Sequence, residues 1–192
     1  DDGRLTLGLP EVQLGIHPGF GGTVRSVQLV GVRAAMDMML TGKTLRGDRA
    51  LKIGLLDRLV PADGAEAACR ELLQRTPSPH RPGLRERMLS WPIGRSFLRD
   101  ALRRQVASRV RREHYPAPFA IVDLWAKYGA RGREAYDAEA QSIAELFQTS
   151  TARNLVRVFQ LQDRLKALGG KNAAADAIRR VHVVGAGIMG GD

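Results

Sequence analysis

A dense run of glycines and prolines near the start of the chain constrains its architecture more than any other feature. Residues 8–22 contain five glycines and two prolines. Because glycine leaves the backbone flexible and proline removes a hydrogen-bond donor, a long helix or strand cannot pass through this run. The sequence therefore predicts a shaped loop around a small helical turn, entered from a short strand at Leu5-Thr6-Leu7.

Short regular elements follow the glycine-rich run. Apolar spacing predicts a helix that Thr23 could cap, a break at Gly31, and a second helix that ends at Thr41-Gly42. The next expected elements are, in order, a helical turn at 48–53, a strand at 55–60 and a helix at 63–74. This alternation indicates a mixed α/β fold for the first part of the chain.

A proline-rich segment separates this part from a helical one. Three prolines fall within residues 77–82 and deny the backbone both helical and ladder hydrogen bonds. Beyond them the expected elements are helices at 95–112, 118–128, 131–148 and 151–168, and a strand at 181–184. The predicted fold class is therefore α/β and mostly helical.

The chain is strongly basic, with a net charge of +10. Basic surfaces bind nucleic acids by releasing counterions, but most of the excess here lies between Arg81 and Arg112. There, arginines alternate with apolar residues at helical spacing: Arg95, Arg99, Arg103 and Arg104 with Phe97, Leu98, Leu102 and Val106. An amphipathic helix with a solvated face explains this pattern, so we expect no nucleic-acid partner. A phosphate-bearing ligand or an acidic partner surface is the alternative.

Other sequence features restrict the classes of protein and of site that the chain can represent. The single cysteine, Cys69, excludes an internal disulfide and fits a reducing compartment. Apolar runs are far shorter than the roughly 20 residues of a membrane span. The four histidines are scattered without other ligands at metal-binding spacing, so no metal is expected. Residues 1–4 carry no initiator Met and no signal sequence, which suggests that the chain begins inside a longer protein.

A glycine motif near the end of the chain has the spacing of a dinucleotide-binding turn. Gly185, Gly187 and Gly190 follow the apolar strand at 181–184. This spacing lets the backbone approach a pyrophosphate at a helix N-terminus, although a chance glycine turn is the alternative. The helix and the acidic residue expected about 20 residues further on would lie beyond Asp192, so we expect no NAD binding by this chain alone.

Glu11 is the candidate for acid–base chemistry. It lies among Leu9, Val12 and Leu14 on the bent loop, where apolar neighbours could remove water from its carboxylate. A carboxylate in such surroundings is suited to proton transfer. A surface glutamate at a turn is the alternative, because no second carboxylate lies nearby in the sequence.

Two longer runs resemble the crotonase (enoyl-CoA hydratase/isomerase) superfamily. They are LGLPEVQLGIHPGFGGTVR and LTGKTLRGDRALKIGLLDRLV. In addition, His114-Tyr115-Pro116-Ala117-Pro118 and the closing VVGAGIMGG are similar to one branch, the α-subunits of bacterial fatty acid oxidation complexes and their mitochondrial and peroxisomal relatives. Those proteins join an enoyl-CoA hydratase/isomerase to an NAD-dependent 3-hydroxyacyl-CoA dehydrogenase. The resemblance implies a partial crotonase-like core at 1–62, a helical extension at 63–178 and the first strand of a Rossmann domain at 179–192.

The resemblance also implies a role for Glu11. Two glutamates of the superfamily flank the double bond of an acyl-CoA thioester, and Glu11 matches the one that delivers a proton to C2. The other glutamate and the two N–H groups of the oxyanion hole belong to family segments that precede Asp1. The chain alone is therefore expected to be inactive, and apolar surface left open would favour self-association. Further implications are an acyl-CoA substrate, NAD in the parent protein, a thiolase subunit as partner and a bacterial cytoplasmic location.

The remaining candidates have simpler expected roles. Lys43 and Arg46 could meet CoA phosphates in the intact enzyme, and His17 is expected to be a solvated loop residue. The structural roles expected are a helix cap at Asp48, a turn residue at His114 and a packing aromatic at Trp125.

The runner-up function is a non-catalytic, basic helical module that binds an acidic partner or nucleic acid. It predicts an exposed Glu11. It also predicts one continuous stripe formed by Arg95, Arg99, Arg103 and Arg109.

Overall fold

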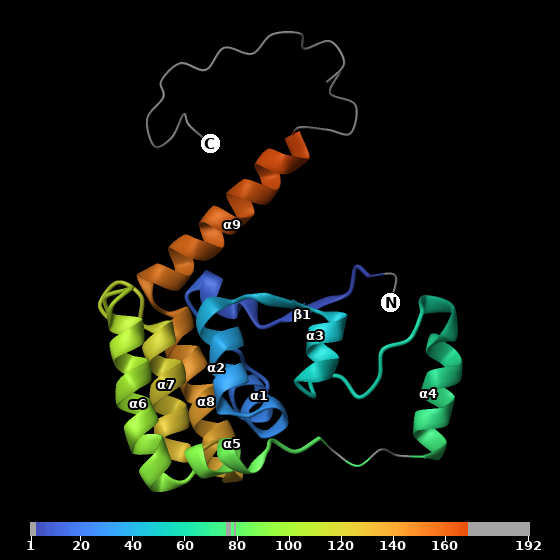
Figure 1. Ribbon diagram of the computed structural model, residues 1–192. Coiled ribbons are helices and arrows are strands. Elements are labelled where there is room, and N and C mark those ends of the chain that lie inside the picture. Colours follow the sequence, from blue (N-terminus) through green and yellow to red (C-terminus); the bar gives the residue numbers. More distant parts are fainter. Residues whose placement is uncertain (1–2, 76–77, 79, 169–192) are drawn as a thin grey trace. The chain divides into compact units, whose positions relative to one another are not determined.

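A computed structural model describes residues 3–75, 78 and 80–168 (Figure 1). The chain divides into two compact units, residues 1–156 and residues 157–192. Helices dominate the described part of the first unit, and the sheet described there has two strands. The predicted class, mostly helical α/β, is confirmed.

The glycine-rich run lies between two paired strands. β1 (Thr6–Gly8) pairs antiparallel with β2 (Thr44–Arg46), so that Leu7 lies opposite Leu45. The elements between and after the strands are the 3-10 helix η1 (Pro10–Leu14), α1 (Gly22–Val30), α2 (Val32–Thr41) and α3 (Gly47–Lys52). The predicted short strand, helical turn and two helices are confirmed within a residue or two.

The strand expected at 55–60 does not form, and that prediction was wrong. These residues follow α3 as bends and irregular backbone. A strand requires a hydrogen-bonded neighbour, and among the described residues β1 and β2 pair only with each other. By contrast β2, which the sequence analysis did not foresee, forms because β1 lies opposite it.

The helical part contains every helix expected between residues 63 and 168. Its elements are η2 (Ala62–Gly64), α4 (Ala65–Gln74), α5 (Leu84–Leu89), α6 (Pro92–Ala107), α7 (Ala117–Tyr128), α8 (Gly132–Phe147) and α9 (Ser150–Leu168). α6 starts at Pro92, because proline fits the first turn of a helix, where its missing N–H has no partner to lose. It ends at Ala107 instead of residue 112. α5 was not anticipated.

One core joins the glycine-rich part to the helical part. Val27 of α1, Met36 and Met39 of α2, and Ile121 and Trp125 of α7 are all buried in it. α7 contacts both α1 and α2. Since burying one such side chain stabilises the fold by about 1.5–3 kcal/mol, this shared core fixes α7 against the segment that carries Glu11.

The amphipathic pattern of α6 is confirmed only in part. Leu98 and Leu102 pack against the core, and Val106 is buried. However, Phe97, expected on the apolar face, is 77% exposed, and Arg95, expected on the solvated face, is half-buried. The buried face of α6 is therefore narrower than the apolar pattern suggested.

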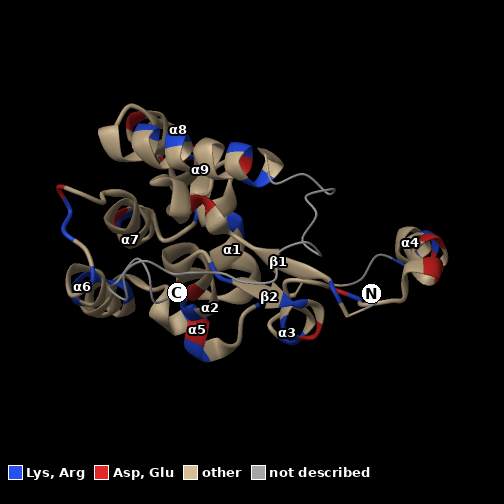
Figure 2. Ribbon diagram, turned by 90° about the horizontal axis from the view of Figure 1, so that it is seen from above, with Lys and Arg blue, Asp and Glu red and all other residues tan. Residues whose placement is uncertain are grey.

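The charged residues are distributed over many elements. Figure 2 shows acidic and basic residues interspersed on α4, α5 and α8. Cys69 is exposed on α4. In the part of the chain that the structure describes, no helix is both long and apolar enough to cross a membrane. The expected strand at 181–184 and its glycine motif lie outside the described residues.

Candidate active site

Glu11 lies on η1, immediately after β1. Pro10 occupies the first turn of this short helix, Val12 is buried in the core, and Gly15 ends the helix with a φ of 75°. This left-handed conformation favours glycine, so the turn depends on the residue found there. The glycine-rich sequence thus produces one tight turn with Glu11 on it.

The Glu11 carboxyl is partly withdrawn from water. The residue as a whole is half-buried, while its Oε2 atom is buried and has no hydrogen-bond partner among the described residues. A buried polar atom without a partner is unusual in folded proteins and is a candidate for binding a ligand. The surface-turn alternative, and the exposed Glu11 of the binding-module alternative, do not fit this placement.

His17 is buried, so the prediction of a solvated loop histidine was wrong. Its Nδ1 lies 2.8 Å from the carbonyl oxygen of Pro18, and its Nε2 lies 3.0 Å from the hydroxyl oxygen of Ser142 on α8. A carbonyl can only accept, so we assign the proton to Nδ1, and the neutral ring then accepts from Ser142. Burial lowers the pKa of His17 despite the opposing effects of the Pro18 carbonyl, Glu139 and Glu11.

Glu139 on α8 holds the loop that leads into α1. It is 2% exposed. Its Oε1 accepts from the Gly21 N–H at 2.6 Å, and its Oε2 accepts from the Thr23 N–H at 2.8 Å and from the Thr23 hydroxyl. The N-cap of α1 is Gly21, which corrects the prediction that Thr23 caps this helix. Glu139 therefore supplies, from α8, the hydrogen-bond acceptor that the first N–H groups of α1 lack.

The buried position of Glu139 was not predicted from the sequence, although the spacing of residues on α8 pointed to it. Ala135, Glu139, Ser142 and Leu146 follow one another at spacings of four, three and four residues. Such spacing marks one helix face, and two of its four members, Ala135 and Leu146, are apolar. A glutamate on a face of this kind calls for a buried partner.

Tyr115 holds η1 by a contact from outside α8. Its hydroxyl donates a hydrogen bond to the carbonyl oxygen of Val12, and burial raises the pKa of Tyr115. This residue belongs to the turn before α7, where His114 also lies as predicted. Tyr115, Glu139 and Ser142 thus bring three side chains of the helical part onto residues 12–23.

Of the two predicted CoA-binding residues, Lys43 precedes β2 and Arg46 ends it. The amide of Gln13 on η1 donates to the carbonyl of Gly42 at 3.2 Å, so the exposed Lys43 follows a turn in contact with η1. Arg46 lies at the opposite end of β2, where its Nη2 donates to the Gly3 carbonyl at 3.3 Å.

Two structural expectations have different outcomes. Asp48 lies inside the first turn of α3, whose N-cap is Arg46 without a side-chain bond, so the predicted cap at Asp48 was wrong. Trp125 is buried in the core, as predicted. Among the described residues, no group of three or more His, Cys, Asp or Glu side chains could hold a metal ion.

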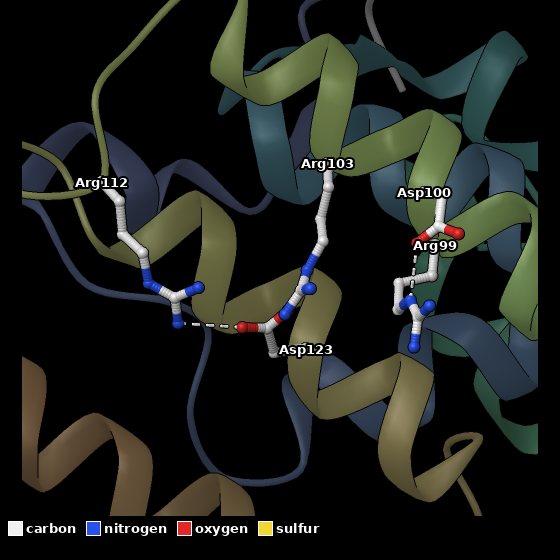
Figure 3. Close-up of polar contacts among 5 residues, drawn as sticks. All are labelled: Arg99, Asp100, Arg103, Arg112 and Asp123. Carbon is white, nitrogen blue, oxygen red and sulfur yellow. Dashed lines mark hydrogen bonds and ion pairs between the residues drawn. The ribbon is translucent and has the colours of Figure 1, made fainter.

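The stripe of arginines expected for a basic binding module is interrupted by carboxylates. Figure 3 shows Asp123 of α7 between Arg103 and Arg112, and Asp100 beside Arg99. The shortest nitrogen–oxygen distances are 2.6 Å for Arg103–Asp123, 2.9 Å for Arg112–Asp123 and 2.8 Å for Arg99–Asp100. These pairs favour a charged, solvated surface over a continuous site for polyanions.

Comparisons of sequence and of structure both find known proteins that are similar to this chain. A sequence profile described as Enoyl-CoA hydratase/isomerase matches residues 3–107. A carnitinyl-CoA hydratase from Mycobacterium avium aligns at 20% identity over 82% of this chain and 49% of its own, with a TM-score of 0.50. A carnitinyl-CoA dehydratase from Mycobacterium avium 104 aligns at 19% identity over 83% of this chain and 50% of its own, also with a TM-score of 0.50. The chain thus spans about half the length of these structures, which show likeness of fold alone. Because the profile covers more than half of the sequence, the chain belongs to the enoyl-CoA hydratase/isomerase family.

Proposed function

We propose that this chain contributes Glu11 as a proton-transferring carboxylate to an enoyl-CoA hydratase with isomerase capability. The observation that carries the proposal is the buried Glu11 Oε2, which has no hydrogen-bond partner among the described residues. Glu11 lies at the start of a segment, residues 12–23, that three remote side chains hold. In hydration, water adds to C3 of the unsaturated thioester and a proton is delivered to C2. Glu11 is the group that delivers this proton, and acyl-CoA is the substrate.

Residues 1–192 alone are proposed to be inactive. Hydration needs a base, an acid and an oxyanion hole together, and losing one oxyanion donor typically lowers the rate about 100- to 1,000-fold. The family resemblance assigns one glutamate to this chain and the remaining groups to other segments.

The wider assignments rest on the sequence resemblance. We propose that the parent protein joins this hydratase to an NAD-dependent 3-hydroxyacyl-CoA dehydrogenase, acts with a thiolase subunit and works in the bacterial cytoplasm. Gly185, Gly187 and Gly190 are the residues that support NAD binding in the parent. Lys43 is the better placed of the two CoA-phosphate candidates, because its turn contacts η1.

Self-association of the separate chain is a further part of the proposal. Several large apolar side chains of the first unit are more than 70% exposed; they are Phe20, Leu73, Leu84, Ile93 and Phe97. Apolar surface of this kind favours association when it is contiguous. Light scattering on the isolated chain should show species larger than a monomer, and a strict monomer would contradict this part.

The direct test of the function is hydration of crotonyl-CoA by the protein that contains this chain. Glu11→Gln should lower kcat by about 100- to 10,000-fold, the usual contribution of a general acid or base. Glu113→Gln, at an exposed glutamate in a turn, is the matched control and should retain wild-type kcat. Wild-type turnover by Glu11→Gln would remove Glu11 from the chemistry. Turnover by residues 1–192 alone would overturn the proposed inactivity.

A further inference from the structure

We infer that Glu139 is a positioning residue for the reaction, in that its carboxylate sets the course of the loop between η1 and α1 and thereby the place of Glu11. This inference rests on the proposed function. Glu139 lies outside residues 3–107, the region that matches the family profile. The positioning group therefore comes from the helical part of the chain.

Both oxygens of the Glu139 carboxylate are occupied by hydrogen bonds to the loop. Glu139 is 2% exposed, and each of its two oxygens accepts at least one hydrogen bond from Gly21 or Thr23. Two of the three donors are backbone N–H groups, so the carboxylate fixes the path of the main chain itself. Hydrogen bonds to a charged acceptor are shorter and stronger than neutral ones, which gives this contact a well-defined geometry.

The loop between η1 and α1 needs contacts from other elements to keep its conformation. Phe20 has a φ of 52°, in the left-handed region that a bulky residue rarely adopts, and its side chain is fully exposed, with a relative accessibility of 103%. An exposed ring gains little packing that could offset an unfavourable backbone. Gly21 follows with a φ of 82°, and a Cβ atom there would lie 2.8 Å from Cε1 of Tyr136 on α8. The bonds from Glu139 to residues 21 and 23 maintain this conformation.

The loop that Glu139 holds also adjoins the segment that carries Glu11. His17, on the same loop, bonds to Ser142, which lies three residues after Glu139 on α8. α8 therefore holds both ends of residues 17–23, and η1, which carries Glu11, ends three residues before His17. Glu11 also lies close enough to His17 to influence its pKa electrostatically. A shift of this loop would move Glu11 relative to the substrate, and a displacement of about 1 Å can lower a rate about 100-fold.

The test uses paired variants in the protein that contains the chain, with crotonyl-CoA hydration as the assay. Glu139→Gln replaces one accepting oxygen with an NH2 group that faces an N–H donor. We expect kcat to fall about 10- to 100-fold while KM stays within about twofold, because the reacting geometry is displaced and the substrate contacts remain. Glu134→Gln, at an exposed glutamate on the same helix, should leave both constants unchanged.

Thr23 provides the control for a purely structural effect. Thr23→Ser keeps the hydroxyl that bonds to Glu139 and should retain wild-type kcat, whereas Thr23→Val keeps the shape and should lower kcat severalfold. If Glu139→Gln does not fold, the Thr23 pair decides the question. Equal kcat values for Thr23→Ser and Thr23→Val, or wild-type kcat in a folded Glu139→Gln, would overturn the inference.

The outcomes also separate this inference from the proposed function. If the wild-type protein is active, and Glu11→Gln loses the activity while Glu139→Gln keeps it, the positioning role alone is overturned. A wild-type protein without any crotonyl-CoA hydration would overturn the function, and the positioning role with it.

Discussion

The glycine-rich segment and the helices that surround it contribute to the site in different ways. Residues 11–23 carry the candidate carboxylate and three positive backbone φ angles, at Gly15, Phe20 and Gly21. The groups that hold this segment are Tyr115, Glu139 and Ser142, which lie 103 to 125 residues away from their partners. A short local motif can therefore supply the candidate carboxylate, while the placement of that segment depends on a remote part of the chain.

Removal of the Glu139 carboxylate should give the largest loss of stability. Glu139→Ala leaves three donors of Gly21 and Thr23 in a buried place without an acceptor. We expect the free energy of unfolding to fall by about 3 kcal/mol, since each buried donor without a partner costs about 1–3 kcal/mol and water can enter part of the vacated space. Urea unfolding of the variant beside Glu134→Ala measures the difference. Equal stabilities of the two variants would show that the two regions are not coupled at this point.

The difference between local and remote contributions explains how much of the fold could be predicted from the sequence alone. The helices at α7, α8 and α9 were predicted closely because apolar spacing along one segment reports which helix face is buried. The short strand β1 and the helical turn of η1 followed from local residue types in the same way. Glu11 could be proposed as a site residue from the sequence because its motif is contiguous.

The failures share a different physical cause, namely contacts with distant residues. Leu55 to Val60 has the composition of a strand, yet pairing depends on a neighbour that the composition does not encode. His17 was expected in solvent, because nothing within residues 8–22 indicates that α8 covers it. The spacing of Ala135, Glu139 and Leu146 could have revealed a buried glutamate, but not its partners.

The pH dependence of stability offers a test at His17. Its pKa is lowered from the ordinary value of 6.5, chiefly by burial, so the folded protein binds a proton at this ring less readily than the unfolded chain does. The contribution of His17 is therefore fully present above about pH 6.5 and is lost as the pH falls through the lower folded pKa. Urea unfolding at pH 7.5 and 5.5 should show a decrease that is smaller in His17→Gln. An identical decrease in both proteins would mean that α8 does not seal this ring from water.

The contact of Tyr115 with Val12 should have a smaller effect. Tyr115→Phe removes one hydroxyl and leaves the Val12 carbonyl without that donor. The expected loss of stability is about 1 kcal/mol, the usual net value of a neutral hydrogen bond. Tyr128→Phe is a suitable control, because that ring also packs at the core without a described hydroxyl bond. Thermal unfolding that ranks the two variants equally would remove Tyr115 from the set of remote supports.

The smallest effect is expected where the helical part faces solvent. Asp123 accepts from Arg103 and Arg112, but the side chains of these arginines are 42% and 59% exposed. Exposed ion pairs contribute about 0–1 kcal/mol and weaken with salt. Arg112→Ala should therefore lower the free energy of unfolding by about 0.5 kcal/mol. Part of this loss should come from the ring of Phe119, which lies 5.6 Å from the guanidinium.

Arg111→Ala, at a neighbouring exposed arginine, is the control and should change the free energy of unfolding less. The difference between the two variants should shrink in 1 M NaCl if charge dominates. A loss as large as that of Glu139→Ala would mean that the solvent face of the helical part supports the fold as strongly as the face that holds the glycine-rich loop.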